Sequence, residues 1–278
     1  VSNLESWGYK VDLGRSALTK NDYLAGADED RLNDLVEALL DPSVRGIICT
    51  RGGYGSARLL EGFPWELMNS ISPKLFVGFS DVSALMLNFW DRLRWKSYFG
   101  LQVANGLDGH YTDRSVAHFR NCLENRNTYI GWLRNQDLVL QSIKEGSCEG
   151  VMIPCCLSIL VSLIGTAFFP ELNDAVLCIE DLNEPLYKYD RMLTQLRMSG
   201  MMDIINGLIL GRFIYKNEDV SDRVSNIAKD VFIDYEFPIW YGMPFGHYDD
   251  RITLAIGDNV RINSQGKIST VKRKVLDV

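Results

Sequence analysis

In the amino-terminal half of the chain, apolar positions alternate between the spacing of a helix and the short runs of buried strands. Within residues 28–40, Leu32, Leu35, Val36, Leu39 and Leu40 stand at i, i+3, i+4, i+7 and i+8, which predicts a helix with one apolar face. Apolar runs at 46–50 and 75–79 predict buried strands, and residues 81–90 return to helical spacing. Helices that alternate with strands through tight connections predict a parallel sheet covered on both faces.

The carboxy-terminal half is predicted to form a second α/β unit that is richer in strands. A polar, weakly patterned segment at 108–146 is interpreted as the connection into it. The elements expected after it are a mostly helical segment at 152–163, strands at 175–179, within 206–213 and within 231–240, a helix at 189–199, and a hairpin formed by 252–260 and 267–271.

These patterns predict an α/β protein of two domains. We expect an N-terminal parallel-sheet domain over residues 1–135 that carries the nucleophile. A smaller, β-rich α/β domain over residues 136–278 is expected to carry the acid and the base.

Composition and charge exclude several classes of function. With 46% hydrophobic and 23% charged residues the chain is typical of globular proteins, and its net charge of −7 disfavours a nucleic-acid partner. Its most apolar stretch, 151–169, is interrupted by Pro, Ser and Gly, so we expect a buried helix there and no membrane segment. The six cysteines form no CxxC pair and do not cluster with histidine, so we expect no metal and a reducing, cytoplasmic setting.

The stretch VGFSDVSAL, residues 77–85, places Ser80 between a predicted strand and a predicted helix. Serine before a helix is most often an N-cap. A tight strand–serine–helix junction is also typical of a nucleophile elbow, in which the hydroxyl is presented for attack. Val82 occupies the position of the second glycine in G-x-S-x-G, so this stretch alone leaves both interpretations open.

A nucleophilic serine needs a base, and the chain has three histidines. His110 lies in the predicted connection, and His118 is interpreted as a surface residue of a polar helix. His247 lies in the glycine-flanked stretch MPFGHYDD, in a predicted loop of the kind that often carries catalytic groups. Glu180 and Asp181 end an apolar strand, and Glu180 is expected to be the more enclosed carboxylate that could orient such a base.

A glycine-rich turn, RGGYG at 51–55, follows the first predicted strand. Glycines after a strand can expose main-chain amides to an oxyanion or a phosphate. The sequence matches neither G-x-G-x-x-G nor G-x-x-x-x-G-K-[ST], so it gives little support to nucleotide binding.

Taken in order, these segments resemble one family. RGGYGSARLL, GFSDVSAL, SILVSLIGT, LCIEDLNEPLYKYDRMLTQLRMSG and MPFGHYDDRITLAIGD are similar to stretches of the LD-carboxypeptidases, serine peptidases of the S66 type. The family includes murein tetrapeptide carboxypeptidases and microcin C immunity peptidases. The similarity extends from about Tyr23 to Asp258.

The resemblance implies a Ser-His-Glu triad and hydrolysis of a terminal amide bond in a small peptide. Ser80 corresponds to the nucleophile, Glu180 to the acid and His247 to the base, and the amides of Gly53 and Asp81 would form the oxyanion hole. The expected reaction cleaves the L,D bond that releases D-alanine from a murein tetrapeptide. The resemblance also implies a cytoplasmic homodimer without metal or cofactor.

A carboxypeptidase must grip a free terminal carboxylate. Arg51 in RGGYG and Arg191 after Glu180 each offer a guanidinium fork that fits a carboxylate, although both could instead form structural ion pairs. Arg51 and the neighbouring Tyr54 are the expected substrate-binding residues.

The chain departs from the family where Gly-Gly-Asn is usual and Pro154, Cys155 and Cys156 stand instead. A glycine pair lets backbone approach a ligand closely, so we expect this segment to weaken activity on the tetrapeptide. Three alternatives follow: a peptidase of the microcin C immunity type, a non-catalytic peptide-binding homologue, and an esterase of the α/β-hydrolase type.

Overall fold

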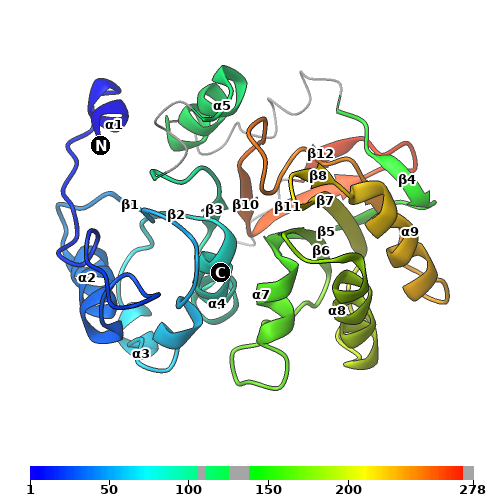
Figure 1. Ribbon diagram of the computed structural model, residues 1–278, viewed down its shortest axis with the longest axis horizontal. Coiled ribbons are helices and arrows are strands. Elements are labelled where there is room, and N and C mark those ends of the chain that lie inside the picture. The colour runs from blue at the N-terminus through cyan, green and yellow to red at the C-terminus, as the bar shows by residue number, and fades with distance from the viewer. Residues whose placement is uncertain (105–109, 125–137, 272–278) are drawn as a thin grey trace, which may run out of the picture.

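The computed structural model describes residues 1–104, 110–124 and 138–271, and it contains two β-sheets that stand side by side (Figure 1). The smaller sheet has the strand order β1-β2-β3-β10, and the larger one has the order β12-β11-β5-β6-β7-β9-β4, with β8 paired to β7. The predicted α/β class is therefore present, although the carboxy-terminal region, expected to be the smaller domain, holds the larger sheet.

The smaller sheet is parallel except for its last strand. β1 (Gly46–Ile48), β2 (Leu75–Gly78) and β3 (Ser97–Phe99) run parallel. The apolar runs at 46–50 and 75–79 predicted the first two. β10 (Leu254–Ile256) comes from the far end of the chain and pairs antiparallel with β3. The predicted division at residues 135 and 136 lies outside the described residues and stays a prediction.

The larger sheet has a parallel centre and antiparallel edges. β5 (Cys148–Cys156), β6 (Ala175–Leu182), β7 (Gly207–Tyr215) and β9 (Ile239–Tyr241) are parallel neighbours. The antiparallel members are β4 (Gln141–Lys144), β8 (Glu218–Asp219), β11 (Asp258–Ile262) and β12 (Ile268–Thr270). β6 is buried along almost its whole length, which explains its uninterrupted apolar sequence.

Helices cover the sheets and fill the space between them. Those of the amino-terminal half are α1 (Ser2–Ser6), α2 (Asp28–Leu40), α3 (Trp65–Met68), α4 (Ser83–Leu93) and α5 (Asp113–Glu124), with short 3₁₀ turns η1 (Ala57–Leu59) and η2 (Ser80–Val82). Those that accompany the larger sheet are α7 (Leu157–Ser162), α8 (Leu186–Met198) and α9 (Ser221–Val231).

Four elements differ from the sequence prediction. The expected first arm of the hairpin, 252–260, is divided between β10, which joins the smaller sheet, and β11, which pairs with β12. The segment 152–163 is not mostly helical, because residues up to Cys156 extend β5 and only then does α7 begin. The supposed connection 108–146 contains α5 and β4. α9 was not predicted, because its buried face is built from small and polar residues, Ser221, Val224, Ser225 and Ala228.

α4 forms the seam between the two sheets. It packs against α7 and β5 (Figure 1), and its residues from Ser83 to Phe89 are all buried. The fully buried Asn88 donates from Nδ2 to the Phe168 carbonyl at 3.0 Å, and Asp91 accepts a hydrogen bond from the Glu171 amide at 2.9 Å. These bonds fix α4 to the turn after α7.

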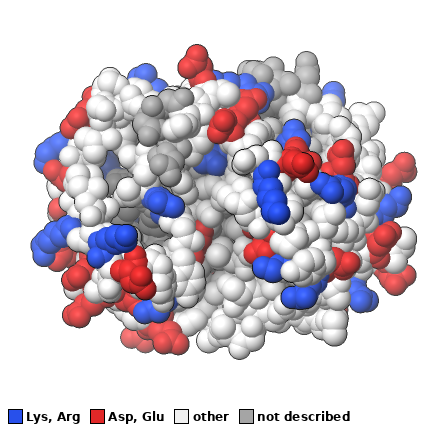
Figure 2. Space-filling view, in the orientation of Figure 1, with Lys and Arg blue, Asp and Glu red and all other residues white. Residues whose placement is uncertain are grey.

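No helix within the described ranges is both long enough and apolar enough to cross a bilayer. On the face shown in Figure 2, positive and negative side chains are interspersed, and no extended basic surface is visible there.

We expect Asn88→Ala to lower the free energy of unfolding by about 2–3 kcal/mol. The change removes a buried donor and leaves the Phe168 carbonyl without it. Asn69→Ala, at an exposed position after α3, should stay within about 0.5 kcal/mol of the parent protein. Urea denaturation measures both, and equal stability of the two variants would contradict the role given to Asn88.

Candidate active site

Ser80 occupies a strained turn between β2 and α4. Its φ angle is +58°, a left-handed conformation that is uncommon for a residue other than glycine and typical of nucleophile elbows. From Phe76 to Phe89 it is the one residue that is not buried. The N-cap interpretation is wrong, since Val82 is the residue that caps α4 and no side-chain capping bond is present at η2 or α4.

A buried hydroxyl anchors this turn to the larger sheet. Ser83 Oγ donates to the Ser80 carbonyl at 2.5 Å and accepts the Cys156 amide at 3.2 Å. Cys156 lies opposite Glu180 in the parallel register of β5 and β6. One side chain therefore connects the main chain of Ser80 to the strand end beside Glu180.

The glycine-rich turn 51–55 lies against Ser80. A Cβ atom built on Gly52 would fall 2.9 Å from the Cβ of Ser80, so only glycine permits this approach without a shift. Asp81 holds the end of the 51–55 turn, because its carboxylate accepts a hydrogen bond from the Ser56 amide at 2.8 Å. The main-chain N–H of Gly53 donates no hydrogen bond to any described residue.

Two exposed side chains project from the same turn. Arg51 makes no ion pair or hydrogen bond with a described residue. Tyr54 is 60% exposed, and its ring centroid lies 5.9 Å from that of Tyr23, which is also exposed. Arg191 is also exposed, on α8, and stacks on Tyr187 at 5.4 Å.

Glu180 and His247 are brought together at the carboxyl end of β6. Glu180 is fully buried, and its Oε2 lies 2.7 Å from His247 Nδ1. This contact occupies Nδ1 and leaves Nε2 as the ring nitrogen available for proton transfer. Gly246, at φ +124°, makes the approach possible, because a Cβ there would lie 2.8 Å from Glu180 Oε2.

The imidazole of His247 also contacts the residue before the serine. The ring centroids of Phe79 and His247 are 4.5 Å apart. The loop after β9 that carries His247 therefore packs directly on the Ser80 turn.

The other two histidines take no part in this arrangement. His110 is exposed. The interpretation of His118 as a surface residue is wrong: it is fully buried in α5, and its Nδ1 accepts the Thr253 amide at 3.1 Å. Its polar neighbours in sequence face solvent, whereas the helix turns this side chain toward β10.

Residues 154–156 do not form a loop, whereas the weaker activity on the tetrapeptide expected from this segment stays a prediction. All three residues are buried in β5 and pair with Cys178, Ile179 and Glu180 of β6. Proline is tolerated because β11 pairs only as far as Met152, so the missing N–H costs no ladder bond.

Asp181 is a structural carboxylate beside the site. It accepts the amide hydrogens of Ser158 at 2.6 Å and Leu182 at 2.7 Å, and so fixes the start of α7. Burial, reinforced by the charge of Glu180, raises the pKa of Asp181 to about 6.

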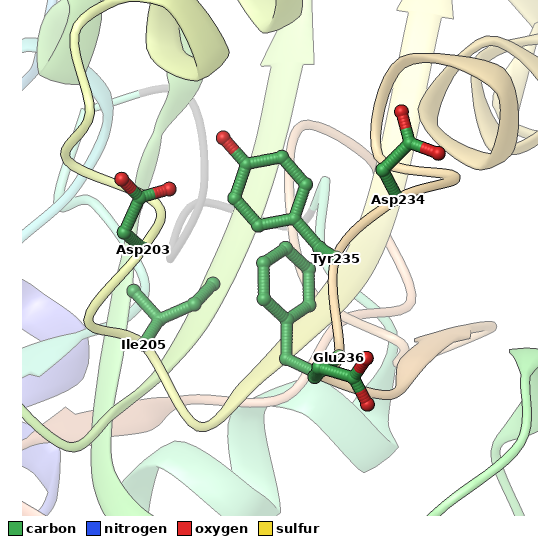
Figure 3. Close-up of a pocket in the computed structure, with 6 residues that line it drawn as sticks. Asp203, Ile205, Asp234, Tyr235 and Glu236 are labelled. Carbon is green, nitrogen blue, oxygen red and sulfur yellow. The ribbon is translucent and has the colours of Figure 1, made fainter.

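A hollow of about 340 Å³ lies elsewhere, lined by Asp203, Ile205, Asp234, Tyr235, Glu236 and Phe237 (Figure 3). These residues precede β7 and β9, at the opposite edge of the parallel sheet from Glu180. Ligands of open α/β sheets bind beyond the carboxyl ends of strands, so the Ser80 turn is the better candidate site. In the described ranges, no three His, Cys, Asp or Glu side chains are grouped as metal ligands.

Three residues beside the candidate site were not predicted from the sequence: Ser83, which binds the Ser80 carbonyl, Arg251, which stacks on Phe79, and Tyr111, which contacts Arg251. Ser83 belongs to the same short motif as Ser80 and could have been suspected. Nothing in the sequence pattern indicates that Arg251 is buried.

Comparison with known proteins gives matches along most of the chain. Residues 1–100 match the LD-carboxypeptidase N-terminal domain, and residues 149–262 match the LD-carboxypeptidase C-terminal domain. A protein of Synechocystis sp. that bears the provisional name of a carboxypeptidase is 32% identical over 93% of this chain and 83% of its own length.

Two solved structures are similar in fold. Muramoyltetrapeptide carboxypeptidase from Oxalobacter formigenes matches with a TM-score of 0.78 and 27% identity, covering 96% of this chain and 90% of its own. The microcin C7 self-immunity protein in its wild-type apo state gives a TM-score of 0.84 at 21% identity, covering 98% and 89%. The second match shows the fold alone.

The raised pKa of Asp181 predicts that the free energy of unfolding depends on pH. Its pKa in the folded protein lies above the ordinary 3.8, so its contribution is fully present below about pH 4 and is lost as pH rises through 6. Asp181→Asn cannot ionise. The stability of the variant relative to the parent should therefore improve by about 2–3 kcal/mol between pH 4 and pH 8.

Asp250→Asn is the matched control: the hydrogen bond from Arg114 lowers the pKa of Asp250 below 3.8, so the carboxylate is ionised in both states above pH 4 and the difference from the parent should stay nearly constant. Urea denaturation across this pH range measures both trends. A pH-independent difference between Asp181→Asn and the parent would refute the prediction.

Proposed function

The chain belongs to the LD-carboxypeptidase family of serine peptidases, and we propose that it cleaves the terminal L,D bond of a murein tetrapeptide with a triad of Ser80, His247 and Glu180. The observation that carries the triad is the 2.7 Å contact between His247 Nδ1 and Glu180 Oε2, beside a serine held at φ +58°. The name of the Oxalobacter structure supports the substrate class.

In the proposed mechanism, Ser80 Oγ attacks the scissile carbonyl while His247 Nε2 takes its proton. Glu180 accepts the Nδ1–H bond and stabilises the imidazolium that forms. The proton then passes from Nε2 to the leaving amine, which is D-alanine, and a water molecule repeats the sequence to release the acyl group.

The oxyanion of the tetrahedral intermediate needs donors on the other side of Ser80. We assign them to the main-chain amides of Gly53 and Asp81. What supports this assignment is the unused Gly53 N–H and the close approach of the 51–55 turn to Ser80. Loss of one such donor typically costs about 10²–10³-fold in kcat.

A second substrate class is a peptide-nucleotide of the kind that microcin immunity peptidases act on. The observation in its favour is the exposed aromatic pair Tyr23 and Tyr54, 69% and 60% exposed, which could stack on a base. The homodimer and the cytoplasmic location expected from the resemblance belong to the same proposal.

The decisive experiment is incubation of the protein with murein tetrapeptide, followed by mass spectrometry. We expect release of the terminal D-alanine, and a parallel incubation with an aminoacyl sulfamoyl adenosine tests the second class. Hydrolysis of the nucleotide conjugate alone would replace the murein assignment.

Triad variants test the roles of the three residues. Ser80→Ala and His247→Ala should each lower kcat by about 10⁴–10⁶-fold, and Glu180→Gln by about 10⁴-fold, because the three act as one unit. The double variant of Ser80 and His247 should lose little more than either single variant. Circular dichroism should show all of them folded, and full activity of His247→Ala would remove it as the base.

Arg51 is the proposed partner of the substrate carboxylate, since it is exposed beside the Ser80 turn and unpaired within the described residues. Amidating the terminal carboxyl of the tetrapeptide should lower kcat/KM by about 10- to 150-fold, the loss of one charge-assisted contact. Arg51→Met should remove most of that preference for the acid over the amide.

Arg58→Met is the control, because the guanidinium of Arg58 is already bound to Asp28. This variant should keep the preference. Equal cleavage of acid and amide by the parent protein would contradict recognition of a terminal carboxylate.

A further inference from the structure

Arg251 is a buried cation at the back of the candidate active site. It lies between His247 and β10 and is 5% exposed. Its guanidinium carbon is 3.8 Å from the ring centroid of Phe79 and 4.5 Å from that of Tyr111. Nη1 donates to the Gly246 carbonyl at 2.9 Å, and Nη2 donates to the Tyr111 hydroxyl.

No described carboxylate lies within ion-pair distance of this guanidinium. Burying a charged side chain is costly, so buried charges are usually paired with an opposite charge or have a functional role. Burial lowers the pKa of Arg251, and the groups that act on it electrostatically are Tyr111, Glu180, Tyr248 and Asp249. A structural ion pair therefore does not explain its position.

The contacts of Arg251 fall on the neighbours of two proposed catalytic residues. Phe79 precedes Ser80, Gly246 precedes His247, and the ring of Phe79 packs on that of His247. We infer that Arg251 is a positioning residue: it holds the loop of His247 against Glu180 and sets the base in register with Ser80. This inference rests on the proposed triad.

A second set of contacts holds the same loop from its outer side. Ser115 Oγ accepts the Arg251 amide at 2.8 Å and donates to the Asp249 carbonyl at 3.1 Å. The exposed Arg114 binds Asp250. The loop therefore has an outer attachment to α5 that lies apart from the rings of Phe79 and His247.

The charge of Arg251 has a consequence of its own. Its positive charge opposes the attraction of Glu180 for a protonated imidazole, so its removal favours the protonated, inactive base. The acid limb of kcat/KM should then move to higher pH. The other titratable or charged groups around Glu180 and His247 are Tyr111, Cys155, Cys156, Asp181, Arg212, Tyr248 and Asp249.

The test compares Arg251→Met, Arg251→Lys and the control Arg114→Met on murein tetrapeptide across pH. Arg251→Met should lower kcat by about 100-fold, the cost of a misplaced catalytic group, with KM changed far less. Its acid limb should move up by roughly 1 pH unit. Arg251→Lys, which keeps a charge and a donor, should recover part of both effects. Arg114→Met loosens only the outer attachment and removes an exposed charge, so it should keep the acid limb of the parent.

An unchanged acid limb in Arg251→Met would overturn the inference, even if activity fell with stability. Should that variant fail to fold, Tyr111→Phe removes only the acceptor of Nη2 and should lower kcat by less than Arg251→Met, with the acid limb in place because the charge remains. An unchanged kcat in Tyr111→Phe would then overturn it.

Proton NMR tests the role of Arg251 independently of whether the protein cleaves the tetrapeptide. The chain has only three histidines, so the imidazole signal of His247 can be assigned with His110→Gln and His247→Gln. Its titration midpoint should move to higher pH in Arg251→Met whether or not the tetrapeptide is cleaved. An inactive parent protein with a shifted midpoint would reject the substrate and retain the role of Arg251.

Discussion

The candidate site depends on one hydrogen bond between a fully buried carboxylate and a partly exposed imidazole. Glu180 has lost its contact with water, and His247 Nδ1, at 2.7 Å, is the donor that its Oε2 faces. An unpaired buried carboxylate is costly, so the loop of His247 is held to the end of β6 by more than packing. This bond leaves Nε2 as the ring nitrogen available for proton transfer in the proposed triad.

The turn of Ser80 is held in a complementary way. A left-handed serine costs of order 1–3 kcal/mol, which the surroundings must offset. Here the offset comes from Ser83 and Asp81, which bind the Ser80 carbonyl, the Cys156 amide and the Ser56 amide. The hydrogen bonds around Ser80 hold its backbone in the left-handed conformation, and this conformation keeps Ser80 from being buried with its neighbours.

Helices and strands could be predicted from the sequence where the spacing of apolar residues fitted only one of the two structures. The stripe at 28–40 predicted α2 with its observed bounds, and the apolar runs predicted β1, β2 and β6. The prediction failed at 152–163, because a buried strand and the first turns of a buried helix are both uninterrupted apolar sequence. The motif residues Ser80, Glu180 and His247 could be selected in advance, whereas Arg251 could not: its burial depends on rings from Phe79 and Tyr111, which only the tertiary fold brings together.

The placement of β10 has a consequence for how the chain matures. Phe99 in β3 pairs with Leu254 in β10, so the first sheet gains its last strand only after residues 254–256 have left the ribosome. Pairings between residues so far apart close large loops and form slowly. His247 lies just before β10 in the sequence, so the base arrives with the strand that completes the sheet of the serine. A chain that lacks β10 thus holds the proposed nucleophile in an incomplete sheet, and the proposed site is assembled only once the segment from His247 to β10 has been made.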